Sequence, residues 1–183
     1  MVAEAVDFGG LNKTVTSGGG PREYIVKSKS GDFENVEIDE RELESPRAGF
    51  YPQIELRGIS KTFQMESQFK PGTTQTMVRL LFKVVGQQAA FSQMFNFESV
   101  SPKSQLGMIF NAIRKQDIVD GEQLDNAFWG EVIGGRFGAM IHIDAKQGAD
   151  GQRREYAKVL KGSVVEAEDA PKGKKNALLD DED

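Results

Sequence analysis

The chain has 183 residues, of which 38% are hydrophobic, and its 28 acidic and 23 basic residues give a formal net charge of −5. This length suits one domain with flanking segments. There is no cysteine and only one histidine, which excludes disulfides and cysteine-ligated zinc and argues against histidine-dependent catalysis.

No segment of the sequence is suited to crossing or entering a membrane. A membrane-spanning helix needs ~20 consecutive apolar residues, and no run comes near that length. The N-terminus lacks the basic and long apolar parts of a secretory signal. We therefore expect a cytoplasmic protein with no membrane partner.

Residues 1–48 are predicted to form an N-terminal arm that is only partly ordered. The Ser-Gly-Gly-Gly-Pro sequence at 17–21 has the composition of a flexible linker. Residues 22–28 fit a short strand. The acidic stretch 32–44 has poor periodicity and ends before Pro46. We expect it either to be solvated or to mimic the negative charge of DNA.

Three strands are predicted next in the chain. Residues 51–66 contain Gly58, which indicates a long strand bent by a bulge. Lys-Pro-Gly at 70–72 predicts a hairpin turn. Residues 75–85 alternate most clearly and form the second strand, and residues 91–98 form the third. The inward face of the second strand comprises Val78, Leu80, Phe82 and Val84.

The period then changes to that of a helix. Ser101 is a suitable N-cap, Pro102 fits the first turn, and one apolar stripe runs through residues 102–115. A short second helix is expected over residues 122–129. Residues 136–146 and 153–165 form the last two strands, joined by a turn at Asp150-Gly151.

This element order predicts a mainly β fold over residues 49–165. Three strands, a helix and a two-strand hairpin are the order of a five-stranded OB-fold-like barrel, whose helix lies between strands 3 and 4. An α+β sandwich would give a similar order. Residues 166–183 follow as a disordered acidic tail, because seven acids, three lysines and no aromatic residue cannot form a core.

The chain resembles bacteriophage single-stranded-DNA-binding proteins over roughly residues 50–165. The resemblance is carried by Tyr-Pro-Gln-Ile at 51–54, the strand 78–84, Ser-Pro-Lys-Ser-Gln-Leu-Gly at 101–107, and Gly-Arg-Phe at 135–137 before the Asp-Gly turn. It implies an OB-fold that coats single-stranded DNA during phage replication or recombination, in the host cytoplasm. It also implies that the tail recruits other replication or recombination proteins. The tail residues that would do so are Leu178, Leu179, Asp180, Asp181, Glu182 and Asp183.

A binder of single strands needs cations for the phosphates and flat rings on which bases stack. Cationic and aromatic residues are interleaved on the predicted strands in this way. The alternative is that the cations are ordinary surface residues and that Phe63 belongs to the core. The candidate DNA-binding residues are Arg57, Lys61, Phe63, Arg79, Lys83, Trp129, Arg136, Arg153, Arg154, Tyr156 and Lys158.

The sequence predicts no enzyme, no cofactor and no metal site. His142 has no converging nucleophile, and the glycines near residue 135 lack the lysine and serine of a phosphate loop. A structural or adaptor protein that binds a protein partner through its acidic segments is the competing hypothesis. The oligomeric state stays open, because edge strands or the N-terminal arm could pair in a homo-oligomer.

Overall fold

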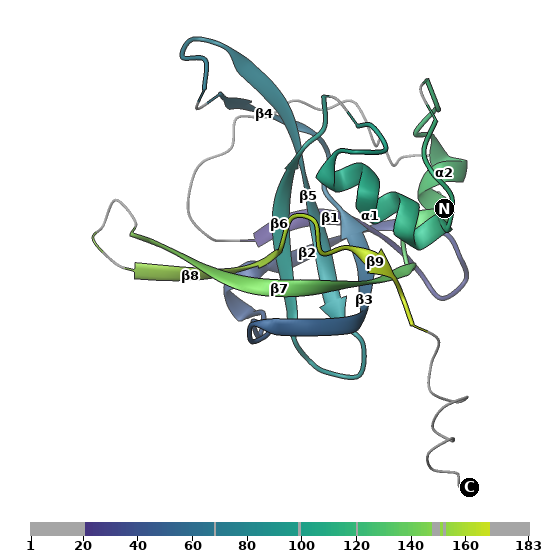
Figure 1. The fold of residues 1–183 in the computed structure, drawn as a ribbon, viewed down its shortest axis with the longest axis horizontal. Helices are drawn as coiled ribbons and strands as arrows, with labels where there is room; N and C mark the ends of the chain where they lie inside the picture. Colours follow the sequence, from purple (N-terminus) through teal and green to yellow (C-terminus); the bar gives the residue numbers. More distant parts are fainter. Residues whose placement is uncertain are drawn as a thin grey trace, which may run out of the picture.

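The computed structural model describes residues 21–67, 69–98, 100–119, 121–147, 151 and 153–168. Within these ranges the chain is mainly β, as predicted, with nine strands in one antiparallel sheet and two α-helices (Figure 1). The strands are β1 (Pro21–Lys27), β2 (Phe33–Asp39), β3 (Gly49–Ile59), β4 (Phe63–Glu66), β5 (Thr74–Val84), β6 (Ala90–Asn96), β7 (Arg136–Gln147), β8 (Arg153–Val159) and β9 (Val165–Glu166). The helices are the short 3-10 turn η2 (Glu40–Glu42), α1 (Gln105–Arg114) and α2 (Asn126–Val132).

The sheet curves around the core without closing into a barrel. β3 pairs with β5 and β7, β5 pairs with β6, and β7 pairs with β8. At the remaining seam β6 and β8 contact each other, but no ladder joins them among the described residues. Gln93 Oε1 instead accepts a 2.8 Å hydrogen bond from the Val159 amide, and Gln105 Nε2 donates to the Val159 carbonyl at 2.9 Å. The predicted closed barrel was wrong, because these side chains satisfy the backbone groups that a closing strand pair would use.

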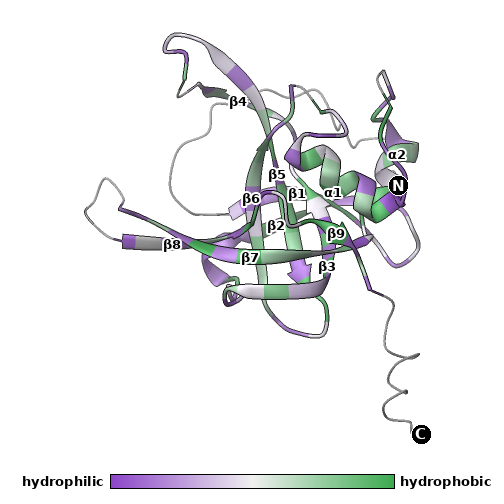
Figure 2. Ribbon diagram, viewed as in Figure 1, coloured by the Kyte–Doolittle hydropathy of each residue, from purple (hydrophilic) through white to green (hydrophobic). Residues whose placement is uncertain are grey.

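The core lies inside the curve of the sheet, against the face of β5 that alternation predicted to point inward. Val78, Leu80, Phe82 and Val84 are all buried. The Phe82 ring packs against the rings of Phe91 and Phe137, with centroids 5.2 and 5.5 Å away. Figure 2 shows hydrophobic and hydrophilic residues succeeding one another along α1. The buried residues of this helix include Leu106, Ile109 and Phe110.

The bulge predicted at Gly58 is present, but the long strand is divided. The register of β3 against β5 shifts between Leu56 and Gly58. A Cβ atom on Gly58 would lie 2.9 Å from the Ile25 carbonyl oxygen, so glycine allows β1 to approach here. β3 ends at Ile59, and β4 is a separate strand that forms a hairpin with β5.

Both α-helices begin later than predicted. The Ser104 hydroxyl, rather than Ser101, accepts the capping bond from the Gly107 amide at 3.0 Å. The Ser101 carbonyl accepts the Ser104 amide at 3.1 Å, so this part of the chain forms a turn instead of a helix. In α2, Asp125 caps by accepting from the Phe128 amide at 3.1 Å.

The second half of the predicted N-terminal arm is folded onto the sheet. β1 and β2 form an antiparallel hairpin, and β1 pairs with the end of β3 through Ile25 and Val26. Tyr24 and Ile25 are buried. Alternation did not predict β2 because no residue of this strand is buried. Residues 1–20 lie outside the described part of the chain.

The last predicted strand is two strands. β8 ends at Val159, a turn follows, and β9 pairs with Phe137 and Gly138 of β7. The β4–β5 and β7–β8 hairpins both extend beyond the body of the molecule, on the left in Figure 1.

Candidate nucleic-acid interface

Two of the predicted base-stacking rings belong to the core. The Trp129 side chain is 1% exposed, and its Nε1 donates to the Leu124 carbonyl at 3.0 Å. Its ring lies edge-on to the rings of Phe110 and Phe128. Phe63 is only 6% exposed. The expectation that bases stack on Trp129 and Phe63 was wrong, because both rings gain more by covering apolar surface in the core.

Arg79 lies on the outer face of β5, as alternation predicted, but its side chain is half-buried and its charge is not fully exposed to solvent. Burial lowers the pKa of its guanidinium, and the nearby charge of Arg22 lowers that pKa further. Its Nε is buried and has no hydrogen-bond partner. The predicted role of Arg79 as an exposed phosphate contact was therefore wrong for this conformation of the chain.

Lys83 and Arg136 lie in one row with an acid between them. Glu55 of β3 is in register with Lys83 on one side and with Arg136 on the other. Lys83 Nζ donates to the Gln87 carbonyl, and Arg136 Nη1 donates to Gln53 Oε1 at 2.8 Å. Glu55 partly compensates these two cations, which weakens the row as a phosphate track.

The bulge and the segment after β3 carry the next two candidates. Arg57 is exposed at the bulge, whereas Lys61, between β3 and β4, is half-buried. Neither residue is in register with the candidates on β7 and β8.

The β7–β8 hairpin brings several candidates together. Ala157 and Val159 point into the core, so Tyr156 and Lys158 share the outer face. Tyr156 is 44% exposed and lies near the Arg79 guanidinium. Lys158 Nζ bonds Asp144 Oδ2 at 3.0 Å, and this bond lowers the pKa of the Asp144 carboxyl.

Arg153 and Arg154 begin β8 at the far end of the hairpin. The Arg153 side chain is exposed, with its Nη2 3.9 Å from Glu155 Oε2. The backbone of Arg154 pairs with Lys146. The Arg154 side chain and the tail residues Leu178 to Asp183 lie outside the described part of the chain.

Sequence reasoning missed an exposed aromatic residue on the other hairpin. Phe69, in the β4–β5 turn, is 88% exposed and is followed by Lys70. The predicted Lys-Pro-Gly turn contained the signal, since a phenylalanine in a polar hairpin turn has no core to enter. Phe69 and Tyr156 are thus the exposed rings that the two projecting hairpins carry.

Glu40 was also missed, although it organises the surface beside Arg79. Its Oε2 accepts hydrogen bonds from the Tyr24 hydroxyl and, at 2.8 Å, from the Ser92 hydroxyl. Arg22 Nε lies 3.3 Å from the same oxygen. Burial raises the pKa of the Tyr24 hydroxyl, and the charge of Glu40 raises it further.

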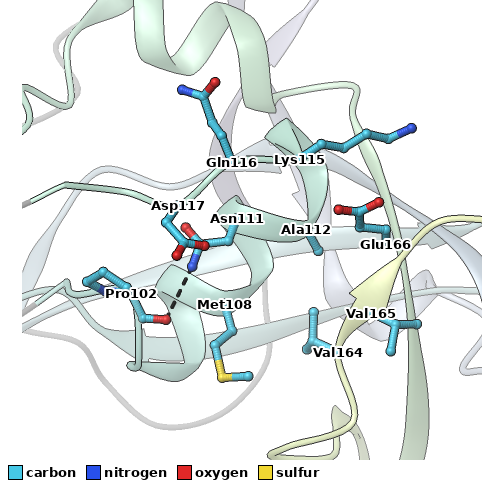
Figure 3. Close-up of a pocket in the computed structure, with 10 residues that line it drawn as sticks. All are labelled: Pro102, Met108, Asn111, Ala112, Lys115, Gln116, Asp117, Val164, Val165 and Glu166. Atoms are coloured by element: carbon cyan, nitrogen blue, oxygen red, sulfur yellow. Dashed lines mark hydrogen bonds between the residues drawn. The ribbon is translucent and has the colours of Figure 1, made fainter.

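A separate hollow of about 400 Å³ lies between α1 and β9 (Figure 3). Met108, Ala112 and Val164 form its apolar wall, and Asn111 Nδ2 donates to the Pro102 carbonyl at 3.2 Å. Its charged groups are one lysine, Lys115, and two acids, Asp117 and Glu166. This mixed lining does not form a basic groove.

The described residues contain no group of three or more histidine and acidic side chains placed to hold a metal ion. None of the helices in the same residues has the length and apolar character needed to cross a membrane. Comparison of the sequence with protein-family models and with curated proteins found no match.

Proposed function

We propose that this protein is a non-enzymatic, sequence-independent single-stranded-DNA-binding protein built on an OB-fold. Its role would be in DNA replication or recombination, as the resemblance to phage proteins implies. DNA would pass between the β4–β5 and β7–β8 hairpins, with bases stacking on Phe69 and Tyr156. Lys70, Arg153 and Lys158 would contact the phosphates.

The strand order supports the OB-fold. β3, β5, β6, β7 and β8 would be its five strands, and α1 falls between the third and the fourth. The four ladders β3–β5, β5–β6, β3–β7 and β7–β8 leave the β6–β8 seam open. OB-folds are partly open five-stranded barrels that bind oligonucleotides with two loops and the face of strands 2 and 3. The two projecting hairpins correspond to those two loops.

The single observation that carries the proposal is the pair of exposed rings on these hairpins. Phe69 lies next to Lys70, and Tyr156 lies on the same strand as Arg153 and on the same face as Lys158. Exposed aromatic residues beside cations are what unspecific single-strand binding needs, since every base offers a flat face.

The experiment is fluorescence anisotropy of a labelled twenty-nucleotide oligo-dT, titrated with the full chain at two salt concentrations. Binding that weakens with salt is expected, because phosphate contacts release counterions. A double-stranded oligonucleotide of the same length serves as the control. No binding of oligo-dT at micromolar protein would overturn the proposal.

The acidic tail would compete with DNA for the cationic surface or recruit partners. Truncation after Glu168 keeps β9 and removes five acids against three lysines. We expect the truncated chain to bind oligo-dT more tightly at low salt, and the gain to disappear at high salt. Unchanged affinity at low salt would remove the tail from the binding mechanism.

An adaptor that binds a protein partner and no DNA is the second candidate. The observation in its favour is an exposed apolar row across three neighbouring segments. Phe50 is in register with Met140, and the Leu160 amide donates to the Met140 carbonyl. All three side chains are exposed. Failure to bind oligo-dT, together with self-association that Met140→Lys abolishes in light scattering, would favour this candidate.

A further inference from the structure

The acidic stretch that precedes β3 folds back over the sheet instead of extending into solvent. Residues 32–44 hold seven acids and one arginine. We use the term strap for residues 40–45, which follow β2 and contact β6. Two contacts with β6 define this path: the Ser92 hydroxyl donates to Glu40, and the Ala90 amide donates to the Glu44 carbonyl at 2.8 Å.

The groups around the Glu40 carboxylate form an anion-binding site. A guanidinium from β1 (Arg22), a phenol from β1 (Tyr24) and a hydroxyl from β6 (Ser92) converge on one oxygen atom. Guanidinium and hydroxyl donors around an anionic oxygen would hold a phosphate oxygen equally well, because the hydrogen bonds are of the same charge-assisted kind. In this conformation the carboxylate of the chain itself fills the site.

Arg79 lies on the same face of the sheet as Ser92, because Arg79 and Leu81 of β5 are in register with Met94 and Ser92 of β6. Arg79 lies close enough for the charges of Glu40 and Arg22 both to influence the pKa of its guanidinium. Arg79 Nε is nevertheless buried without a hydrogen-bond partner. The guanidinium groups of Arg22 and Arg79 therefore both lie near the Glu40 carboxylate. A phosphodiester, with two non-bridging oxygens, offers acceptors to both.

The strap is held less firmly than the strand that supplies the site. In β1, Tyr24 and Ile25 are buried, and Ile25 is part of the core. In η2 no residue is buried, and Arg41, Glu42, Glu44 and Ser45 are exposed. Breaking the Glu40 contacts and the bond from Ala90 would release the strap while β1 keeps Arg22 and Tyr24 in place.

The site adjoins the hairpin surface of the proposed function. Tyr156, the exposed ring on β8, lies near the Arg79 guanidinium, and β8 contacts β6, which pairs with β5 beside Arg79. Arg79 is also on β5, five residues after the strand leaves the β4–β5 turn at Thr74. A strand of DNA that passes between the two hairpins would therefore meet Arg79 and Arg22 if the strap moved aside.

We propose that Arg22, Arg79, Tyr24 and Ser92 form a phosphate-binding site for the backbone of single-stranded DNA, and that Glu40 of the strap occupies this site until DNA displaces it. This inference rests on the proposed function and adds an internal competitor to it. The strap imitates the ligand, since its carboxylate takes the position of a phosphate. DNA binding then has to open the strap, which lowers the affinity of the resting protein.

The test compares two variants that each remove one negative charge from the same 3-10 turn. Glu40→Gln removes the acid that fills the site, and Glu42→Gln is the control, because Glu42 is exposed. We expect Glu40→Gln to tighten oligo-dT binding about tenfold, the scale of one charge-assisted hydrogen bond. Glu42→Gln should change the affinity by less than about twofold. Adding Arg79→Gln to Glu40→Gln should cancel the gain.

The outcomes separate this inference from the proposed function. If the wild type binds oligo-dT and Glu40→Gln binds no more tightly than Glu42→Gln, the strap is not a competitor and only this inference fails. If the double variant keeps the full gain, Arg79 is not part of the site and the inference fails as stated. If neither the wild type nor any of the variants binds oligo-dT, the proposed function itself fails.

A measurement on the wild-type chain covers the case in which Glu40→Gln does not fold. Hydrogen exchange of the Ala90 amide, which donates to the Glu44 carbonyl of the strap, is followed with and without oligo-dT. Faster exchange of this amide in the presence of oligo-dT is expected, since the strap leaves the sheet. Unchanged or slower exchange would overturn the inference. Inorganic phosphate at the same total phosphate concentration should have no effect, and an equal effect would contradict the assignment to a DNA backbone.

Discussion

Tyr24 and Tyr156 both lie near the same arginine, Arg79, but they belong to very different surroundings. Tyr24 is 0% exposed beneath the strap, whereas Tyr156 is 44% exposed on the β7–β8 hairpin. The comparison teaches that one outer sheet face is divided into a covered half and an open half. Residues of the same type stabilise the fold in the covered half and are available to a ligand in the open half.

The largest expected effect separates the two tyrosines by stability. Tyr24→Ala removes a fully buried ring, for which a loss of about 3–5 kcal/mol in the free energy of unfolding is typical. Tyr156→Ala removes a half-exposed ring and should cost less than about 1 kcal/mol. Urea unfolding of both variants measures the difference. Equal losses for the two variants would abolish the distinction between the covered and the open half.

For DNA binding, in contrast to stability, we expect the larger losses from substitutions in the open half. Phe69→Ala and Tyr156→Ala should each weaken oligo-dT binding by about 1–3 kcal/mol, because each removes one stacking platform. Phe50→Ala is the matched control, since Phe50 is an exposed phenylalanine on β3, outside both hairpins. Anisotropy titrations at one salt concentration give the three affinities. A loss in Phe50→Ala as large as in Phe69→Ala would argue against a localised interface.

The cations of the open half should determine how binding depends on salt. Lys70→Gln and Arg153→Gln should each reduce the slope of log affinity against log salt by about 1, if each residue contacts one phosphate. Lys103→Gln, an exposed lysine just before α1, should leave the slope unchanged. Equal slopes for all three variants and the wild type would show that these hairpin cations do not contact phosphates.

The smallest expected effect concerns the Asp144–Lys158 pair of the open half. The hydrogen bond from Lys158 lowers the pKa of the Asp144 carboxyl from its usual value of 3.8. A depressed pKa means that the folded state favours the ionised form, so the stabilisation is complete above pH ~4 and disappears as pH falls further. Asp144→Asn should therefore lower the urea midpoint slightly at pH 7 and leave it unchanged near pH 2. A difference of equal size at both pH values would exclude this ion pair as its cause.

Alternation along the chain predicted several elements correctly. The inward face of β5 follows from alternation along the strand, and the burial of Val78 and Phe82 agrees with it. The bulge at Gly58 and the turn at residues 70–72 follow from local backbone chemistry. These features depend on neighbours within a few residues, so a sequence alone can reveal them.

The candidate site was predicted less well, because exposure depends on what packs against a strand. Alternation placed Arg79 on the outer face of β5, yet it could not show that this residue is half-buried while Tyr156 is exposed. Trp129 has a polar edge that suggested a binding surface, but the Leu124 carbonyl satisfies it inside the core. Phe69 was overlooked because it is a single ring in a turn with no periodic pattern.

The sequence by itself determined the mainly β character, the placing of the principal strands and the acidic composition of residues 32–44. Only the tertiary structure decided where those acids lie, that no ladder joins β6 and β8 among the described residues, and which aromatic residues face solvent. The physical reason is the distance along the chain over which each kind of interaction acts. Periodicity and turn chemistry act between near neighbours, whereas the contact of Glu40 with Ser92 joins residues 52 positions apart and forms only when the whole sheet is assembled.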